Sequence, residues 1–143
     1  MEAQVDVSSA IPGVGPTFRS GVHMTFQRIG LGITGEDLAC EELEKRGYAI
    51  IAKRYRGKTG EIDIIARDRE TLVFVEVKAR TTHEFGSAAE AVTPAKQHQL
   101  MRVAGEYLLH NRLRECPCRF DVVSIHLDSG APEIEVFQNA FDA

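Results

Sequence analysis

Three charged residues near the middle of the chain have the types and the spacing of a divalent-cation site. Glu76 follows Asp63 after twelve intervening residues, and Lys78 follows Glu76 after one. Carboxylate oxygens are preferred Mg²⁺ ligands, and one or two of them leave coordination positions for a substrate phosphate. A lysine two residues past a ligand shares its face of a strand, so its ammonium reaches a water or phosphate held by the cation. The pattern predicts metal-assisted chemistry on a phosphate ester.

A hairpin is the element that must bring these residues together. Strand-like sequence runs over 60–68 and 71–79, and a tight turn at 69–70 separates the two runs. Because side chains alternate along a strand, one face of this hairpin is wholly apolar and the other is charged at its far end. The apolar face consists of Ile62, Ile64, Ala66, Val73, Val75 and Val77. The other face consists of Glu61, Asp63, Ile65, Arg67, Leu72, Phe74, Glu76 and Lys78. We expect this second face to be half-buried.

The register across the turn decides which charges meet. It places Asp63 opposite Glu76 and Glu61 opposite Lys78, with all four side chains on one face. Directly opposed Cβ atoms are about 5 Å apart, and like charges in such a pair destabilise a sheet. A divalent cation between Asp63 and Glu76 would offset this repulsion. The alternative interpretation is a solvated face whose charges form a lattice of salt bridges.

Two further polar residues interrupt the apolar stripes of predicted helices. Glu36 lies in the middle of the stripe of a helix over 34–46, where a carboxylate is costly to bury unless it is paired or coordinated. It is either a third carboxylate of the site or a first-turn glutamate that the helix dipole favours. Gln97 lies on the stripe of a second helix, over 93–111. It is either a site residue or an exposed glutamine at the start of that helix.

The charge around the hairpin favours a polyanionic partner. Between residues 53 and 80 there are eight basic and five acidic residues, a local charge of +3. A basic stretch beside paired carboxylates suits a phosphate polymer, and a tyrosine among the bases offers a ring to a nucleobase. The candidate nucleic-acid contacts are Arg54, Tyr55, Arg56, Lys58 and Arg80. Basic residues also protect edge strands from aggregation, which is the alternative explanation.

Length and composition limit the class of protein. The chain has 143 residues with 43% hydrophobic residues and a net charge of -4, which suits one globular domain and excludes a protein coated with positive charge. We expect a flexible tail over 1–23 and a single domain over 24–143, with Met24 as a candidate natural start. Three cysteines without a C-x-x-C pair argue against zinc and for reduced thiols in the cytoplasm. No apolar run is long enough for a membrane span.

The remaining strand-like runs complete the expected order of elements. They cover 48–56, 119–127 and 133–138, so the order is α-β-β-β-α-β-β. This alternation predicts an α/β fold.

The sequence resembles the YraN family, which is related to archaeal Holliday junction resolvases and belongs to the PD-(D/E)XK nuclease superfamily. The matching residues are Gly35, Glu36, the string Gly60-Glu61-Ile62-Asp63, the string Glu76-Val77-Lys78, Gln97, and the string Arg119-Phe120-Asp121-Val122-Val123. The resemblance covers about 30–141. One departure is Ile62, which stands where the superfamily has a proline before its aspartate.

This resemblance implies a restriction-endonuclease-like core, a central mixed β-sheet flanked by helices, and a role for each candidate. Asp63 and Glu76 would bind Mg²⁺ or Mn²⁺ together with the backbone carbonyl of Val77. Lys78 would orient the attacking water and stabilise developing charge. Glu36 would complete the site through a water molecule. Gln97 would support it.

The implied function is a metal-dependent endonuclease that acts on DNA, including branched DNA. The resolvase relatives act as dimers, so a homodimer is expected by analogy. Two alternatives remain open on the sequence. One is a nucleic-acid-binding module of the same fold without efficient catalysis, and the other is a structural protein whose charged face is a salt-bridge lattice.

Overall fold

The computed structural model describes residues 34–80, 92–127 and 130–142. Its elements are helix α3 (Gly35–Lys45), strands β1 (Ala49–Arg56), β2 (Glu61–Asp68) and β3 (Thr71–Arg80), helix α5 (Pro94–His110), and strands β4 (Cys118–His126) and β5 (Glu133–Phe141). The predicted order α-β-β-β-α-β-β is confirmed, with element ends displaced by three residues or fewer. The expected tail over 1–23 lies outside the described residues.

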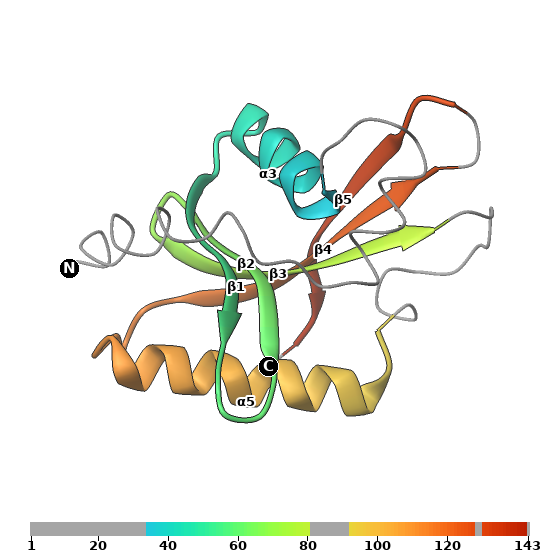
Figure 1. Ribbon diagram of the computed structural model, residues 1–143. Coiled ribbons are helices and arrows are strands. Elements are labelled where there is room, and N and C mark those ends of the chain that lie inside the picture. The colour runs from blue at the N-terminus through green and yellow to red at the C-terminus, as the bar shows by residue number, and fades with distance from the viewer. Residues whose placement is uncertain (1–33, 81–91, 128–129, 143) are drawn as a thin grey trace.

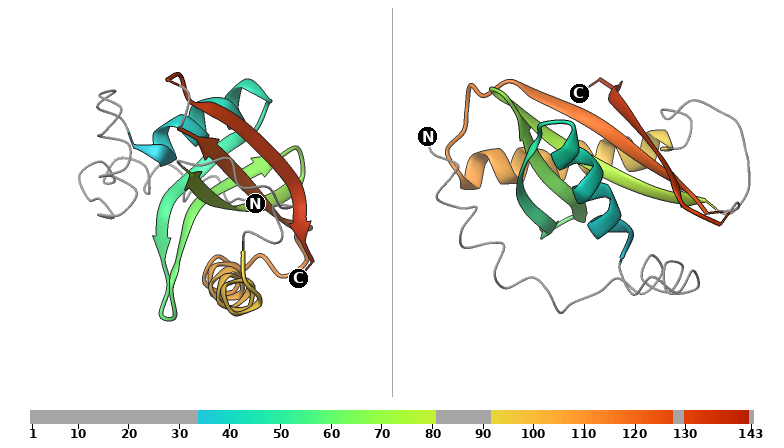
Figure 2. Two further views of the ribbon diagram at one scale, coloured as in Figure 1. Left: turned by 90° about the vertical axis from the view of Figure 1, so that its right-hand side faces the viewer. Right: turned by 90° about the horizontal axis from the view of Figure 1, so that it is seen from above.

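The strands form one mixed sheet in the order β1-β2-β3-β4-β5. Only β3 and β4 pair in parallel, and α5 lies in the crossover that such a connection requires. Helix α3 covers one face of the sheet and helix α5 covers the other (Figure 1). Figure 2 shows the same three layers from two further directions. This is the α/β architecture expected from the sequence. Among the described residues, no helix is long and apolar enough to cross a membrane.

Each helix begins and ends where its local sequence predicts. Thr34 and Asp37 form a capping box at the start of α3, with the Asp37 N–H donating to Thr34 Oγ1 at 3.1 Å. Gly47 follows the helix with a φ of +97°, a conformation that an L side chain rarely adopts. At the start of α5, Thr93 accepts a hydrogen bond from the Lys96 N–H.

Both faces of the β2–β3 hairpin pack into a core, so the second face is more buried than the expected half-buried face, and only its ends at Glu61, Arg67 and Lys78 are partly exposed. Ile64, Val73, Val75 and Val77 belong to the core beneath α3. Ile65, Leu72 and Phe74 belong to the core beneath α5. Phe74 is only 2% exposed. The hairpin pattern alone does not show this burial, because α5 follows β3 by more than a dozen residues.

The hairpin register is as predicted next to the turn and ends before the charged residues. Cα pairing runs from Asp68 opposite Thr71 to Ile64 opposite Val75 and stops there. From that point β2 remains paired with β1 alone. The predicted backbone pairs of Asp63 with Glu76 and of Glu61 with Lys78 are therefore wrong.

At the end of β2 where pairing with β3 has stopped, the side chains also lie in positions other than those predicted. Glu61 lies opposite Arg56, and their charged groups are 3.8 Å apart. Ile62 packs beneath α5 together with Ile65, whereas Ile64 packs beneath α3. The assignment of Ile62 to the face of Ile64 is therefore also wrong. The regular alternation of side chains between the two faces is interrupted at Asp63, where β2 ceases to pair with β3.

Candidate functional site

Four acidic side chains are buried in the part of the chain that the structure describes. Glu36 is 2% exposed, Asp63 4%, Glu76 7% and Asp121 0%. An ionised carboxylate is costly to bury unless it is paired or coordinated. Three of the four are the carboxylates selected from the sequence. The alternative of a solvated face with a salt-bridge lattice does not describe these residues.

Asp63 stands at the point where β2 and β3 separate. Its Oδ2 accepts a hydrogen bond of 2.9 Å from the Val77 backbone N–H. In a strand, the N–H and C=O of one residue point to the same side, so the Val77 carbonyl is also directed towards β2. The separation of the strands thus brings a carboxylate and a backbone carbonyl to the same gap.

Glu76 precedes Val77 on β3, so the second carboxylate lies beside the same gap. The parallel register puts Glu76 level with Val122 of β4. Its Oε2 is 3.9 Å from the Nζ of Lys96, in the first turn of α5. The Lys96 side chain is 37% exposed, and an ion pair of this length near the surface contributes little to stability. The first turn of α5 therefore borders the gap.

Lys78 lies two residues beyond Glu76 on the same face of β3. Its side chain is half-buried. Among the residues that the structure describes, its ammonium has neither a hydrogen bond nor an ion pair. A cation in this position is available to a bound phosphate or water.

Glu36 reaches the sheet through an ion pair that the sequence pattern did not reveal. Its Oε1 accepts a hydrogen bond of 2.8 Å from Arg54 Nε on β1. Arg54 has a φ of 56°, which interrupts the alternation of the strand and turns two successive cations, Lys53 and Arg54, towards α3. Arg54 falls between the paired positions Lys53–Ile64 and Tyr55–Ile62, which places it across from Asp63.

Arg54 therefore belongs to the interior of the site. Its side chain is 11% exposed and ion-paired with Glu36, and its role as a nucleic-acid contact stays a prediction. The missed signal is conformational, because a left-handed residue inside a strand is not apparent from residue type.

The donor set can be compared with what a divalent cation requires. Within residues 34–80, 92–127 and 130–142, no three His, Cys, Asp or Glu side chains form a group that could hold a metal ion. Glu36 is paired with Arg54, and its action in the site through water stays a prediction. Asp63, Glu76 and the Val77 carbonyl remain. They fit Mg²⁺, which takes one or two carboxylates and fills its other positions with water and phosphate.

A model described as "Uncharacterised protein family UPF0102" matches residues 35–125. The chain belongs to the UPF0102 family. This confirms the resemblance to the YraN family, which is the same group of proteins.

Curated relatives match 78% to 83% of this UPF0102 chain. It is 47% identical to the UPF0102 protein of Geobacter sulfurreducens, over 78% of this chain and 88% of the relative. It is 50% identical to the Lachnoclostridium phytofermentans protein, over 78% and 92%, respectively. The Syntrophotalea carbinolica protein is 43% identical, over 83% and 97%.

The remaining candidates of the UPF0102 chain lie around the gap or on the β1–β2 hairpin. Gln97 donates from Nε2 to the Val92 carbonyl at 2.9 Å and so holds the start of α5. Its direct role in the site stays a prediction. Arg80 ends β3. Tyr55 packs edge-on against Tyr107, with ring centroids 5.1 Å apart. Arg56 and Lys58 are exposed at the turn end of the hairpin.

Removal of the Glu36 carboxylate is expected to destabilise the UPF0102 fold. Glu36→Ala removes one hydrogen-bonded partner of the Arg54 guanidinium and should lower the free energy of unfolding by about 2 kcal/mol. Glu36→Gln keeps an oxygen acceptor and should lower it by less. Urea unfolding of the three proteins measures both differences. Equal stability of Glu36→Ala and the native chain would show that the ion pair is dispensable.

Proposed function

We propose that this UPF0102 protein is a metal-dependent endonuclease that cleaves phosphodiester bonds of nucleic acid, with DNA as the substrate and Mg²⁺ or Mn²⁺ as the cofactor. The observation that carries the proposal is the gap between β2 and β3. Two buried carboxylates and a backbone carbonyl border it, beside a lysine that has no partner among the residues the structure describes. Oxygen ligands and a nearby cation are the groups that phosphodiester hydrolysis requires.

Each residue of the gap has a distinct task in this proposal. Asp63, Glu76 and the Val77 carbonyl would hold the ion. A bound divalent cation supplies Lewis acidity to a phosphoryl oxygen and to water. Lys78 orients the attacking water and stabilises the negative charge that develops on the phosphate. Glu36 holds Arg54 across from Asp63, and Gln97 holds the start of α5 beside the gap.

The finer expectations from the resemblance are part of the same proposal. They are branched DNA as a substrate, a homodimer as the active unit, and the cytoplasm as the location. A panel of branched and linear DNAs with Mg²⁺ or Mn²⁺, with Asp63→Ala as the inactive control, tests the activity directly. Cleavage by the native chain alone supports the enzyme. Binding by both proteins without cleavage supports the alternative of a nucleic-acid-binding module.

Metal binding should also be visible in stability. Asp63 and Glu76 repel one another when no cation is present, so Mn²⁺ should raise the melting temperature of the native chain. A ligand at 100 times its dissociation constant stabilises the fold by about 2.7 kcal/mol. Asp63→Ala should lose this shift, whereas Glu70→Ala, which removes an exposed acid at the turn of the same hairpin, should keep it. Equal shifts in all three proteins would place the ion elsewhere.

A further inference from the structure

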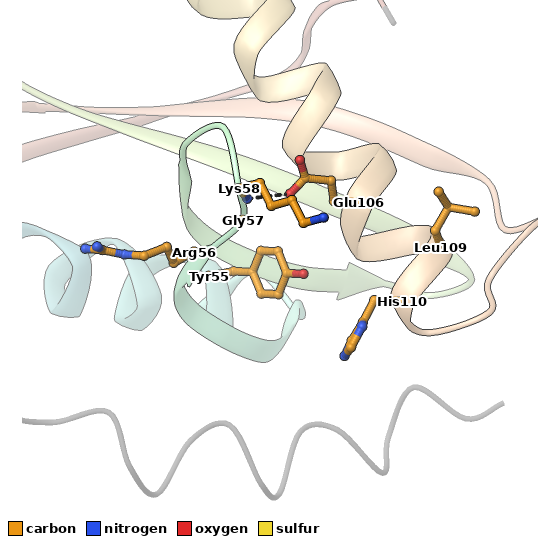
Figure 3. A pocket seen from close by; sticks show the side chains of 7 residues that line it. All are labelled: Tyr55, Arg56, Gly57, Lys58, Glu106, Leu109 and His110. Carbon is orange, nitrogen blue, oxygen red and sulfur yellow. Dashed lines mark hydrogen bonds between the residues drawn. The ribbon is translucent and has the colours of Figure 1, made fainter.

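A second polar hollow lies on the other side of the β1–β2 hairpin from the carboxylates. It is an open pocket of about 700 Å³ between the hairpin turn and the C-terminal half of α5 (Figure 3). Its lining consists of Tyr55, Arg56, Gly57, Lys58, Glu106, Leu109 and His110. The Arg56 side chain points away from the other labelled side chains in Figure 3, so Lys58 supplies the cation at this hollow and His110 adds an imidazole ring.

The pocket has a defined shape because the hairpin turn is held on α5. The Lys58 backbone N–H donates to Glu106 Oε1 at 2.8 Å, and Gln99 Nε2 donates to the Thr59 carbonyl at 2.7 Å. Gly57 permits this approach, because a Cβ at that position would collide with Glu106 Oε1. The turn is thus attached at two points, one at Gln99 and one at Glu106, two turns apart along the helix.

Three hydrogen-bond donors at this pocket have no protein acceptor in the described part of the chain. They are the Tyr55 hydroxyl, the Lys58 ammonium and the His110 ring. Burial and the neighbouring Glu106 raise the pKa of Tyr55, so its phenol stays protonated and donates. Glu106, the single acid in the lining, already uses one oxygen for the hairpin backbone. The available groups therefore suit an anion.

We infer that this pocket binds a backbone phosphate of the nucleic acid, away from the phosphate that is cleaved. The inference rests on the proposed function and adds a second point of contact to it. A phosphate accepts from several donors at once, and most contacts that position nucleic acid are of this kind. Leu109, which is 74% exposed at the rim, offers an apolar surface to a sugar.

The place of the pocket along α5 sets its distance from the cleavage site. Lys96 borders Glu76 and Glu106 borders the pocket, a separation of ten residues or about 15 Å along the helix axis. A DNA strand carries a charge about every 3.4 Å of its axis, so the two sites lie roughly four nucleotides apart. The proposed cleavage site thus lies on one side of the β1–β2 hairpin, and the pocket that holds the DNA strand lies on the other side.

Salt-dependent binding tests the pocket without any cleavage. The affinity for a short fluorescein-labelled DNA duplex is measured in EDTA over a range of salt concentrations. Lys58→Gln should reduce the slope of log affinity against log salt by about 0.9, the loss of one phosphate contact. Tyr55→Phe should weaken binding by about tenfold with little change of slope, because it removes a neutral donor and keeps the ring on Tyr107.

The control is Lys45→Gln, which removes an exposed lysine at the end of α3, on the opposite face of the sheet. It should bind as the native chain does. The Lys58 side chain is exposed and its backbone N–H makes the contact with α5, so the substitution leaves the turn attached. If Lys58→Gln and Lys45→Gln both bind DNA as the native chain does, with the same slope of log affinity against log salt, the pocket does not bind phosphate. The nuclease proposal is unaffected by that result. No binding by the native chain contradicts both.

Discussion

Replacement of Lys78 by methionine is expected to lower the rate of DNA cleavage by about 100-fold or more. Within the described part of the chain Lys78 has no partner, so in the proposed nuclease its ammonium serves the reacting phosphate and water. Loss of one group that stabilises transition-state charge typically costs 10²- to 10³-fold in rate. Methionine keeps the length of the apolar stem and removes the charge. Single-turnover cleavage at saturating enzyme measures the chemical step.

The same variant should behave differently in the two binding assays. Its Mn²⁺-induced rise in melting temperature should equal or exceed that of the native chain, because a nearby positive charge disfavours the ion. DNA affinity should fall only modestly, by the loss of one contact among several. Lys45→Met, far from the gap, serves as the matched control and should cleave at the native rate. If Lys78→Met also cleaves at the native rate, Lys78 takes no part in the chemical step.

The largest expected effect on stability comes from Asp121, the fourth buried acid. Its carboxylate accepts from the Tyr48 hydroxyl at 2.7 Å, from Arg119 Nε at 2.9 Å and from the Asn139 N–H at 2.9 Å. Its hydrogen bonds raise the pKa of Arg119, which also binds Asp68 at 3.0 Å. This network ties β4 to β5 and to the end of β2. A fully bonded carboxylate of this kind is structural.

Asp121→Ala should therefore lower the free energy of unfolding by about 4 kcal/mol, since removing one partner of a buried ion pair is strongly destabilising and the Tyr48 and Asn139 donors lose their acceptor as well. Asp121→Asn retains an oxygen acceptor and should cost clearly less. Chemical denaturation measures both. A loss below about 1 kcal/mol for the alanine variant would contradict the structural role. Any folded fraction of Asp121→Asn should keep the Mn²⁺ shift, because its hydrogen bonds do not involve Asp63 or Glu76.

Much of the fold follows from interactions between near neighbours in the sequence. Thr34 and Gly47 bound α3, and the register next to the 69–70 turn follows from strand alternation. Glu36 sits on an apolar helical stripe, and the structure places it at 2% exposure. Helical and strand periods, caps and tight turns span only a few residues, so the sequence alone determines them.

The geometry of the site was decided by contacts between segments that are distant along the chain. The sequence identified Asp63 and Glu76, but it predicted that they face each other in a continuous backbone pairing of β2 with β3. In the structure Val77 donates to the Asp63 side chain, and β2 stops pairing with β3 beyond Ile64 while it stays paired with β1. Whether the Val77 N–H binds a backbone or a side-chain acceptor depends on the positions of β1, β2 and β3 relative to one another.

The same reason applies to Arg54 and to the pocket. The left-handed backbone at Arg54 accompanies an ion pair with Glu36 of α3, a residue 18 positions away in the sequence. The pocket exists because Glu106 binds a backbone N–H that is 48 residues away in sequence. Residue types and periods specify which elements form and which faces they bury. Which side chains finally meet, and through which atoms, depends on how those elements pack in three dimensions.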